Sequence, residues 1–243
     1  MSRLGRGEIF ALCALRSAHV GALNTVSRCS ESRRKSLMLR PFFILIVAAC
    51  LLSGLAQCSS GEVRRAVELP LGEFRAGDII FRRGEGMTSD FVAFNDPEGE
   101  YSHVGMIVST DSGLMAVHAL PGSHPTQAGE DLVRAETLQE FFAPENALYG
   151  KVMRLPMRDA QRAELSQRAL EKVAQRVEFD HDYDDKDTVR LYCTELLQLL
   201  YSHVGIDLAE GRITSISVPG VHADVIMPAD VHRNSLLTPI FSY

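Results

Sequence analysis

Hydrophobic residues recur at offsets of three and four between residues 189 and 204, the spacing of one face of an α-helix. The apolar positions are Val189, Tyr192, Cys193, Leu196, Leu197, Leu200 and Val204. Cys193 lies near the start of this predicted helix, where the positive end of the helix dipole favours a thiolate over a thiol. Most buried reduced cysteines, however, act as small core hydrophobes. This segment alone therefore leaves a structural and a catalytic interpretation of Cys193 open.

Residues 101–108 and 114–120 are the clearest strands of the sequence, two mostly apolar segments separated by turn residues. The residues between them, 110–113, have the composition of a turn, so the two strands should form a β-hairpin. With an even-numbered loop, His103 falls on the same face as His118, either opposite it or offset by one pair. An odd loop without a bulge would separate the two histidines onto opposite faces.

The remaining patterns predict further strands and helices, which make an α+β domain. Short apolar segments beside turn residues indicate strands at 77–82, 151–155, 213–218 and 224–227. Helices are expected near 89–94 and 138–142 and over 159–177, the last capped by Asp159. The other residues between 121 and 150 should form loops. No internal repeat or low-complexity linker is visible, so we expect a single domain.

The N-terminal segment has the pattern of an export signal. An apolar run over residues 41–56 follows Arg33, Arg34, Lys35 and Arg40. The run is short for a membrane-spanning helix and fits the hydrophobic region of a signal peptide. Translation from Met38 would give a signal of conventional length, and residues 1–37 would then be a misassigned start.

The end of this run resembles a bacterial lipobox, Leu55-Ala56-Gln57-Cys58, in which Cys58 would carry the lipid. Gln57 departs from the small residue that normally precedes the cysteine, and cleavage after Ala56 is the alternative. We therefore expect an exported protein of the periplasm or cell envelope, with a lipid anchor at Cys58 favoured over a soluble form. Residues 1–57 are interpreted as the leader, 58–73 as a tether and 74–243 as the folded domain.

Charge and cysteine content limit the functions of that domain. The leader carries a net charge of +6, whereas the residues from Cys58 onward carry 17 Lys and Arg against 29 Asp and Glu, a net charge of −12. An acidic domain argues against binding nucleic acid, and we expect membrane contact only through the anchor. Beyond Cys58, Cys193 is the only cysteine and has no disulfide partner within the domain. A single thiol in an oxidising compartment is either buried or used, which favours a functional Cys193.

Three segments resemble motifs of the permuted papain-like cysteine hydrolases of the YiiX/YebB type: Gly77-Asp78-Ile79-Ile80-Phe81, Ser102-His103-Val104-Gly105-Met106 and Tyr192-Cys193-Thr194-Glu195-Leu196. The resemblance covers roughly residues 74–228, and related families include NlpC-type peptidases and lecithin retinol acyltransferase-like proteins. It implies a circularly permuted papain-like fold, with an antiparallel sheet or barrel packed against helices that include the nucleophile helix. A Tyr-Asp pair common before the cysteine helix corresponds to Tyr183 and Asp184, although a solvated loop is the favoured interpretation there.

The resemblance also assigns roles to the candidate site residues. Cys193 would be the nucleophile, His103 the general base and acid, and His118 the residue that orients His103. Many YiiX-like members have a glutamate near the place of His118, whereas a histidine there is more similar to the acyltransferase branch. Glu195 and Asp78 are interpreted as structural.

These observations predict an exported cysteine hydrolase that cleaves an amide bond in cell-wall peptides, such as peptidoglycan fragments, through an acyl-enzyme and without a cofactor or metal. One alternative is a lipid acyl hydrolase or acyltransferase on the same fold. Another is a non-catalytic envelope lipoprotein that binds a peptide or lipid. A metal hydrolase with His103, His118 and Cys193 as ligands is a further alternative, but the tight ligand spacings typical of such sites are missing from the sequence.

Overall fold

The computed structural model describes residues 65–96, 99–121, 131–183, 189–218 and 221–243. The contacts divide the chain after Gly61, and the described residues all belong to the unit Glu62–Tyr243. The predicted leader, including Cys58, lies outside the described residues. In the described part of the chain, no helix is both long enough and apolar enough to cross a membrane.

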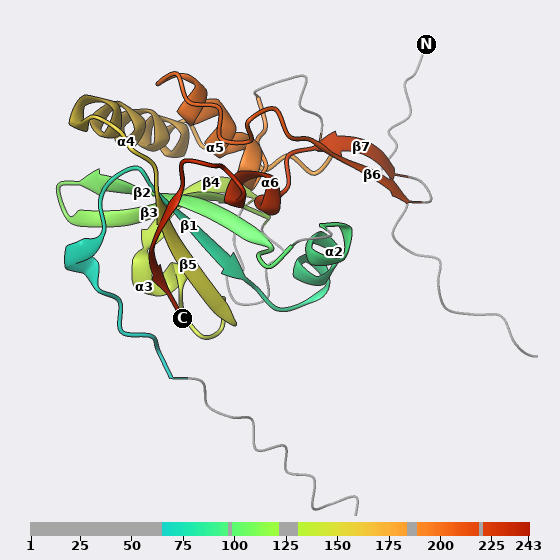
Figure 1. Cartoon of the computed structure of the whole chain (residues 1–243), viewed down its shortest axis with the longest axis horizontal. Coiled ribbons are helices and arrows are strands. Elements are labelled where there is room, and N and C mark those ends of the chain that lie inside the picture. Colours follow the sequence, from blue (N-terminus) through green and yellow to red (C-terminus); the bar gives the residue numbers. More distant parts are fainter. Residues whose placement is uncertain (1–64, 97–98, 122–130, 184–188, 219–220) are drawn as a thin grey trace, which may run out of the picture. The chain divides into compact units, whose positions relative to one another are not determined.

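Six antiparallel strands form the central sheet of this unit, in the order β4-β3-β2-β1-β5-β8 (Figure 1). These strands are β1 (Asp78–Arg83), β2 (His103–Thr110), β3 (Gly113–Leu120), β4 (Leu132–Thr137), β5 (Tyr149–Arg154) and β8 (Thr238–Ser242). A separate hairpin consists of β6 (Thr214–Val218) and β7 (Val221–Val225). The helices are α2 (Met87–Asn95), α3 (Leu138–Phe141), α4 (Asp159–Ala174), α5 (Cys193–Ser202) and α6 (Pro228–His232), with a 3-10 turn at Leu71–Glu73.

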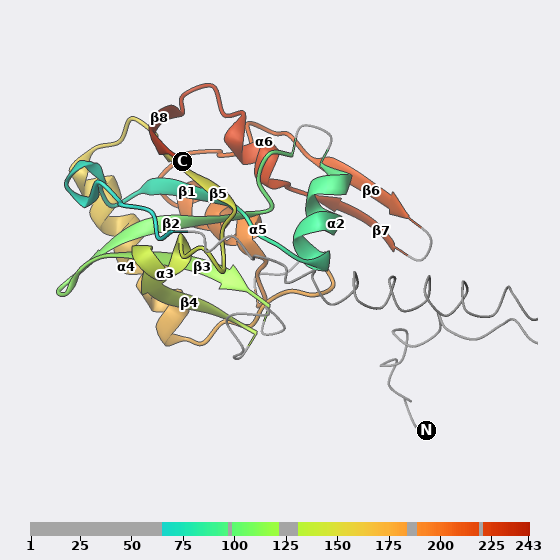
Figure 2. The same cartoon turned by 90° about the horizontal axis from the view of Figure 1, so that it is seen from below.

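Side-chain alternation along the strands gives the sheet two hydrophobic faces. Helices lie on both sides of the sheet (Figures 1 and 2). On one face, Val104 and Met106 belong to the core that also contains Leu165 of α4 and Leu196 of α5. On the other face, Ile107 packs in a smaller core with α3. The predicted α+β class is confirmed, with the sheet enclosed between helices.

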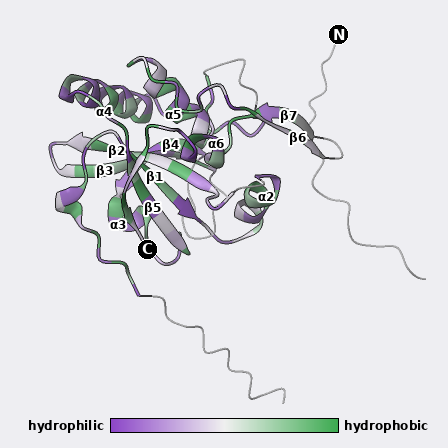
Figure 3. Ribbon diagram, in the orientation of Figure 1, coloured by the Kyte–Doolittle hydropathy of each residue, from purple (hydrophilic) through white to green (hydrophobic). Residues whose placement is uncertain are grey.

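Helix α4 covers the sheet with a single apolar side. Its residues alternate between hydrophobic and hydrophilic along the helix (Figure 3), and Leu165 and Ala169 are fully buried. Asp159 is the first residue of this helix, while Arg158 occupies the N-cap position predicted for Asp159. The helix ends at Ala174, somewhat before the predicted end at residue 177.

Helix α5 is anchored at both ends. The Thr194 hydroxyl donates a hydrogen bond to the Ile226 carbonyl, and the Tyr201 hydroxyl donates one to the carbonyl of Gly77 at the start of β1, over 2.9 Å. Between them, Leu196, Leu197 and Leu200 are buried, as the three- and four-residue spacing predicts. The first turn of α5 is therefore held in a fixed position against the sheet.

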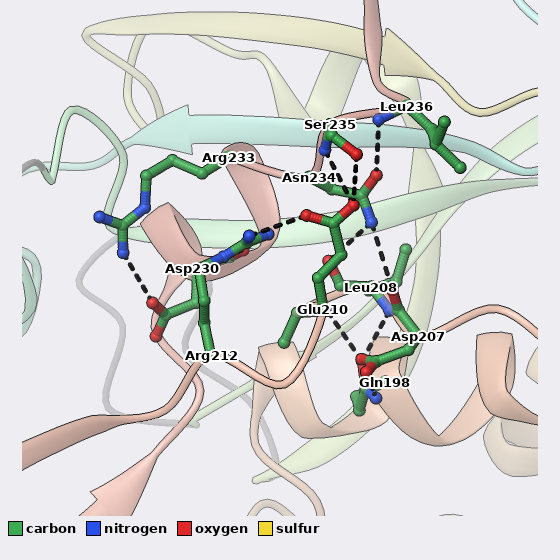
Figure 4. A network of polar contacts seen from close by, with 11 residues as sticks. Gln198, Asp207, Leu208, Glu210, Arg212, Asp230, Arg233, Asn234, Ser235 and Leu236 are labelled. Atoms are coloured by element: carbon green, nitrogen blue, oxygen red, sulfur yellow. Dashed lines mark hydrogen bonds and ion pairs between the residues drawn. The ribbon is translucent and has the colours of Figure 1, made fainter.

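A polar network fixes the chain after α5 to the segment that follows α6 (Figure 4). Gln198 of α5 accepts a hydrogen bond from the Leu208 N–H, and Asn234 donates to the Leu208 carbonyl. Glu210 accepts from both Arg212 and Ser235. These bonds cross-link segments that carry little regular structure, and together with the buried Leu208 they hold the C-terminal end of α5 in place.

Several elements differ from the sequence-based expectations. Strand β4 lies inside the segment predicted as loop, and α6 and β8 form where a polar end was expected. The hairpin of β2 and β3 agrees with the prediction, because Thr110 pairs with Gly113 and leaves a loop of two residues. Packing also begins before residue 74, since Val67 and Leu69 of the predicted tether contact the smaller core.

Candidate active site

Cys193 is the first residue of α5, and its sulfur lies beside the start of β2. Three backbone N–H groups form hydrogen bonds with the sulfur, those of Cys193, Thr194 and Val104. The paired part of β2 and β3 begins at Met106 and Val117, so the Val104 N–H is directed to the thiol rather than to β3. Since Val104 directly follows His103, the thiol lies next to the strand position that carries this histidine.

The surroundings of Cys193 act on its ionisation in opposite directions. Burial raises the pKa of the Cys193 thiol to about 11, while the three N–H groups and the guanidinium of Arg82 lower it. Cys193 nevertheless keeps part of its surface open to solvent, which weakens the effect of burial. Burial thus opposes the effect of the helix start, and a neighbouring base that accepts the thiol proton would help to form the thiolate.

The two predicted histidines lie side by side on one face of the sheet. The Nε2 atom of His103 is 2.8 Å from the Nδ1 atom of His118, within hydrogen-bonding distance, and the two rings meet edge to face. Extending the β2–β3 register by one pair places Gly105 opposite His118, so the histidines are offset by one pair, as the hairpin geometry predicts. His118 is completely buried and His103 is 8% exposed.

Two charged residues that sequence reasoning did not single out extend this pair. Glu136 of β4 places its Oε1 atom 3.1 Å from Nε2 of His118 and 3.7 Å from the Arg82 guanidinium. Arg82 pairs with His103 across β1 and β2, donates a hydrogen bond to the Phe141 carbonyl, and lies 4.5 Å above the Phe141 ring. No sequence signal identified Glu136, because the strand that carries it was predicted as a loop.

Burial and charge both act on this group of side chains. Burial lowers the pKa of His118, with a partly opposing effect from Glu136, so His118 is neutral at neutral pH. Burial also lowers the pKa of Arg82 to about 10, while Glu136 and the Cys193 thiolate would raise it. Arg82 is therefore a cation at neutral pH, and its charge lies close enough to Cys193 to favour a thiolate.

Tyr183 belongs to the vicinity of the thiol rather than to a solvated loop. Its ring packs against Tyr192, the residue before Cys193, and against Phe179. Burial, the Cys193 thiolate and Asp180 together raise the pKa of Tyr183 to about 12. Its φ angle of 53° is in the left-handed region that non-glycine residues seldom adopt. Its sequence neighbour Asp184 lies outside the described residues.

Asp78 and Glu195 have the structural contacts expected of them. Asp78 is fully buried and accepts two hydrogen bonds from Arg154 and one from the Arg75 N–H. Glu195 accepts a hydrogen bond from the Tyr192 N–H at the start of α5. Asp78 thus stabilises an ion pair and a turn before β1, and Glu195 stabilises the backbone at the start of α5.

The arrangement of the histidines does not match a common metal site. The His103 and His118 nitrogens that would have to face one ion are hydrogen-bonded to each other. Within the described ranges, no group of three or more His, Cys, Asp or Glu residues is arranged to hold a metal ion.

The histidines lie on strands of an antiparallel sheet, and the helix that begins with the cysteine follows these strands along the chain. This is the order of a circularly permuted papain-like cysteine hydrolase. The family model of the permuted papain-like amidases, YaeF/YiiX, C92 family, matches residues 73–222. The chain belongs to this family. It is therefore an enzyme of the cysteine peptidase or amidase type, and the permuted papain-like fold predicted from the three sequence motifs is confirmed.

A solved structure supports the same fold. The crystal structure of the metalloprotein YiiX from Escherichia coli O157:H7 matches with a TM-score of 0.57 at 19% sequence identity, covering 70% of this chain and 98% of that chain. At this identity the likeness concerns the fold alone. A search of curated proteins gives no significant match.

Proposed function

We propose that the protein is an amide hydrolase in which Cys193 is the nucleophile, His103 the general base and acid, and His118 the residue that orients His103. The observation that carries the proposal is the hydrogen bond between Nε2 of His103 and Nδ1 of His118, next to a thiol bound by the Val104 N–H. Because Nε2 of His103 is engaged with His118, Nδ1 is the nitrogen that exchanges a proton with the thiol. The amidase family supports an amide as the bond cleaved.

The reaction follows from these positions. His103 takes the thiol proton at Nδ1, and the sulfur of Cys193 attacks the amide carbonyl. Backbone N–H groups at the start of α5 stabilise the oxyanion of the tetrahedral intermediate. The C–N bond then breaks, the leaving amine takes the proton from His103, and a thioester remains on Cys193. Water, deprotonated by His103, hydrolyses the thioester and releases the acid and the thiol.

Alkylation of Cys193 by iodoacetamide as a function of pH tests the Cys193–His103 pair without a known substrate. In the wild type we expect an apparent thiol pKa below the ordinary value of about 8.5, because an imidazolium beside the sulfur stabilises the thiolate. In His103→Ala the apparent pKa of Cys193 should be higher than in the wild type, because the imidazolium beside the sulfur is lost and burial raises the pKa of the thiol. Identical profiles in both proteins would refute the assignment of His103.

We also propose that the substrate is a peptide amide of the cell wall and that the enzyme acts in the cell envelope. The signal-like segment before Cys58 and the amidase family support this location and substrate class. Peptidoglycan fragments released by digestion of cell walls, incubated with wild type and with Cys193→Ala, test the substrate by mass spectrometry. New amines in the wild-type sample alone would support the proposed substrate. A separate test concerns the predicted start of translation at Met38, which a peptide from residues 1–37 in the native protein would contradict.

A further inference from the structure

Glu136 and Arg82 extend the pair of histidines, His103 and His118, across the sheet. In the β3–β4 register His118 pairs with Arg134 and Ala116 pairs with Glu136, so His118 and Glu136 are diagonal neighbours on the same face. In the β1–β2 register Arg82 pairs with His103. Four adjacent strands thus place Arg82, His103, His118 and Glu136 on one side of the sheet.

Extending the proposed function, we propose that Glu136, neutralised by Arg82, is a positioning residue that fixes the tautomer of His118 and thereby the orientation of His103. Neither residue contacts the reacting atoms in this scheme. Glu136 acts on His118, and Arg82 acts on Glu136.

The tautomer follows from the chemistry of the carboxylate. An ionised Glu136 is only an acceptor, so the nitrogen that faces it, Nε2 of His118, must carry the proton. The contact is bent rather than linear, since the two atoms are 3.1 Å apart without hydrogen-bond alignment. The other tautomer would still place an imidazole lone pair 3.1 Å from a carboxylate in a buried site, which is strongly unfavourable. Nδ1 of His118 is then an acceptor, and Nε2–H of His103 must donate to it.

This direction of donation suits the proposed reaction. With its Nε2 proton committed to His118, a neutral His103 has Nδ1 as its basic nitrogen and can take the proton of Cys193. After that transfer, the imidazolium of His103 still donates to His118, and its charge is stabilised through His118 by Glu136. The proton stays on His103, and Glu136 remains ionised throughout.

Arg82 explains how a carboxylate can remain ionised at this depth. Glu136 is 8% exposed and Arg82 only 1%, so each charge would be costly without the other. The guanidinium is in turn held by the Phe141 carbonyl at 2.8 Å and by the Phe141 ring. The ion pair is close to neutral overall. Its carboxylate lies next to His118, and a negative charge there stabilises the imidazolium of His103.

The variant Glu136→Gln tests this inference, because an amide can present either an oxygen or an N–H group to His118. We expect part of His118 to convert to the Nδ1–H tautomer, which forces His103 to accept at Nε2 and to carry its proton on Nδ1, facing the thiol. Nitrogen NMR of protein labelled at histidine reports both tautomers directly. The iodoacetamide rate at neutral pH should fall by about 10- to 100-fold, less than the effect of about 10⁴ seen when the residue that orients a catalytic histidine directly is neutralised in a serine protease.

Controls separate positioning from general structure. Glu164→Gln removes a carboxylate from the exposed side of α4, where it pairs with Arg168, and should change neither tautomer nor alkylation rate. Glu136→Asp keeps the acceptor and should retain the Nε2–H tautomer of His118. Glu136, Arg82 and Arg134 all act on the pKa of His118, and Arg82 also acts on the pKa of Cys193. The pH profile is therefore to be compared across variants rather than assigned to one group.

Three outcomes would overturn the inference: an Nδ1–H tautomer of His118 in the wild type, an unchanged tautomer in Glu136→Gln, or an unchanged alkylation rate in that variant. The wild-type spectrum decides the matter even if Glu136→Gln fails to fold. Failure of the proposed function looks different, because His103→Ala would then alkylate like the wild type while the tautomer of His118 still depended on Glu136.

Discussion

Gly105 lies against His118 so closely that a β-carbon at this position would be 3.1 Å from the Cβ atom of His118. The same carbon would be 3.0 Å from the Val117 carbonyl oxygen and 3.3 Å from the Phe141 ring. These contacts are tight, and two of them involve atoms that cannot move without shifting the strand or the histidine. A glycine is therefore needed at this position of the Ser-His-Val-Gly segment, because a larger residue would displace His118 from its place beside His103.

Gly105→Ala should consequently lower both stability and reactivity. Overpacking of this kind typically costs about 1 to 3 kcal/mol of unfolding free energy. Displacement of His118 should also slow alkylation of Cys193 at neutral pH. Urea unfolding and iodoacetamide kinetics measure the two effects. The matched control is Gly72→Ala, because a β-carbon there meets no atom within 4 Å; equal losses in the two variants would contradict the steric explanation.

The ion pair of Asp78 and Arg154 makes a second prediction, about stability alone. Asp78 is completely buried, and Arg154 donates two hydrogen bonds to it at 2.7 and 2.6 Å. Arg154→Met leaves a buried carboxylate without its main partner, and we expect a loss of about 3 to 5 kcal/mol in unfolding free energy. The affected contacts lie at the start of β1, so the alkylation rate of Cys193 in the folded protein should stay unchanged.

The surface pair of Arg168 and Glu164 provides the control for that experiment. These side chains are more than a third exposed and lie one helical turn apart on α4. Arg168→Met should therefore cost less than about 1 kcal/mol. A loss in Arg168→Met as large as that in Arg154→Met would show that burial of Asp78 does not determine the effect.

The catalytic assignments predict a graded loss of turnover. Cys193→Ala and His103→Ala should abolish hydrolysis of whichever wall peptide the wild type cleaves, because each removes a group that forms or breaks a bond. His118→Ala should leave a reduced activity, since His103 keeps its Nδ1 atom but loses the hydrogen bond that orients it. Circular dichroism shows whether each variant is folded. Full activity of Cys193→Ala would refute the nucleophile.

The sequence predicted the parts of the site that follow from short-range patterns. Alternation along residues 101–120 placed His103 and His118 on one face, because strand period and loop length together determine register. Helical periodicity likewise placed Cys193 at the start of α5. Both depend on residues that lie close together in the sequence.

Glu136 and Arg82 could not be predicted in this way. Glu136 belongs to a strand, residues 132–137, in which charged and apolar positions look like those of a surface loop, and only pairing with β3 makes it a strand. Arg82 is the last residue of the strand predicted over 77–82, and an arginine at such a position ordinarily points to solvent. Its burial depends on Phe141 and Glu136, which are distant in sequence.

The burial of His118 predicts how stability changes with pH. Burial lowers the pKa of His118 in the folded protein, with Arg82 and Arg134 acting in the same direction and Glu136 against it. In the unfolded chain the pKa of histidine is about 6.5, so the unfolded state binds a proton first as the pH falls. Below about pH 6.5 the unfolding free energy should therefore decrease by up to about 1.4 kcal/mol per pH unit for this group, and the decrease stops below the folded pKa.

Urea unfolding of the wild type and His118→Gln between pH 7.5 and 5 measures this contribution. The variant should lose less stability on acidification, although its stability at neutral pH differs from that of the wild type. His232 has a pKa lowered by burial and by Lys151, so His232→Gln should reduce the slope in the same direction and the double variant should reduce it further. Equal slopes of unfolding free energy against pH in the wild type and His118→Gln would contradict this prediction. His118 would then take up a proton as readily in the folded protein as in the unfolded chain. Burial would not keep His118 in the neutral form on which its role depends.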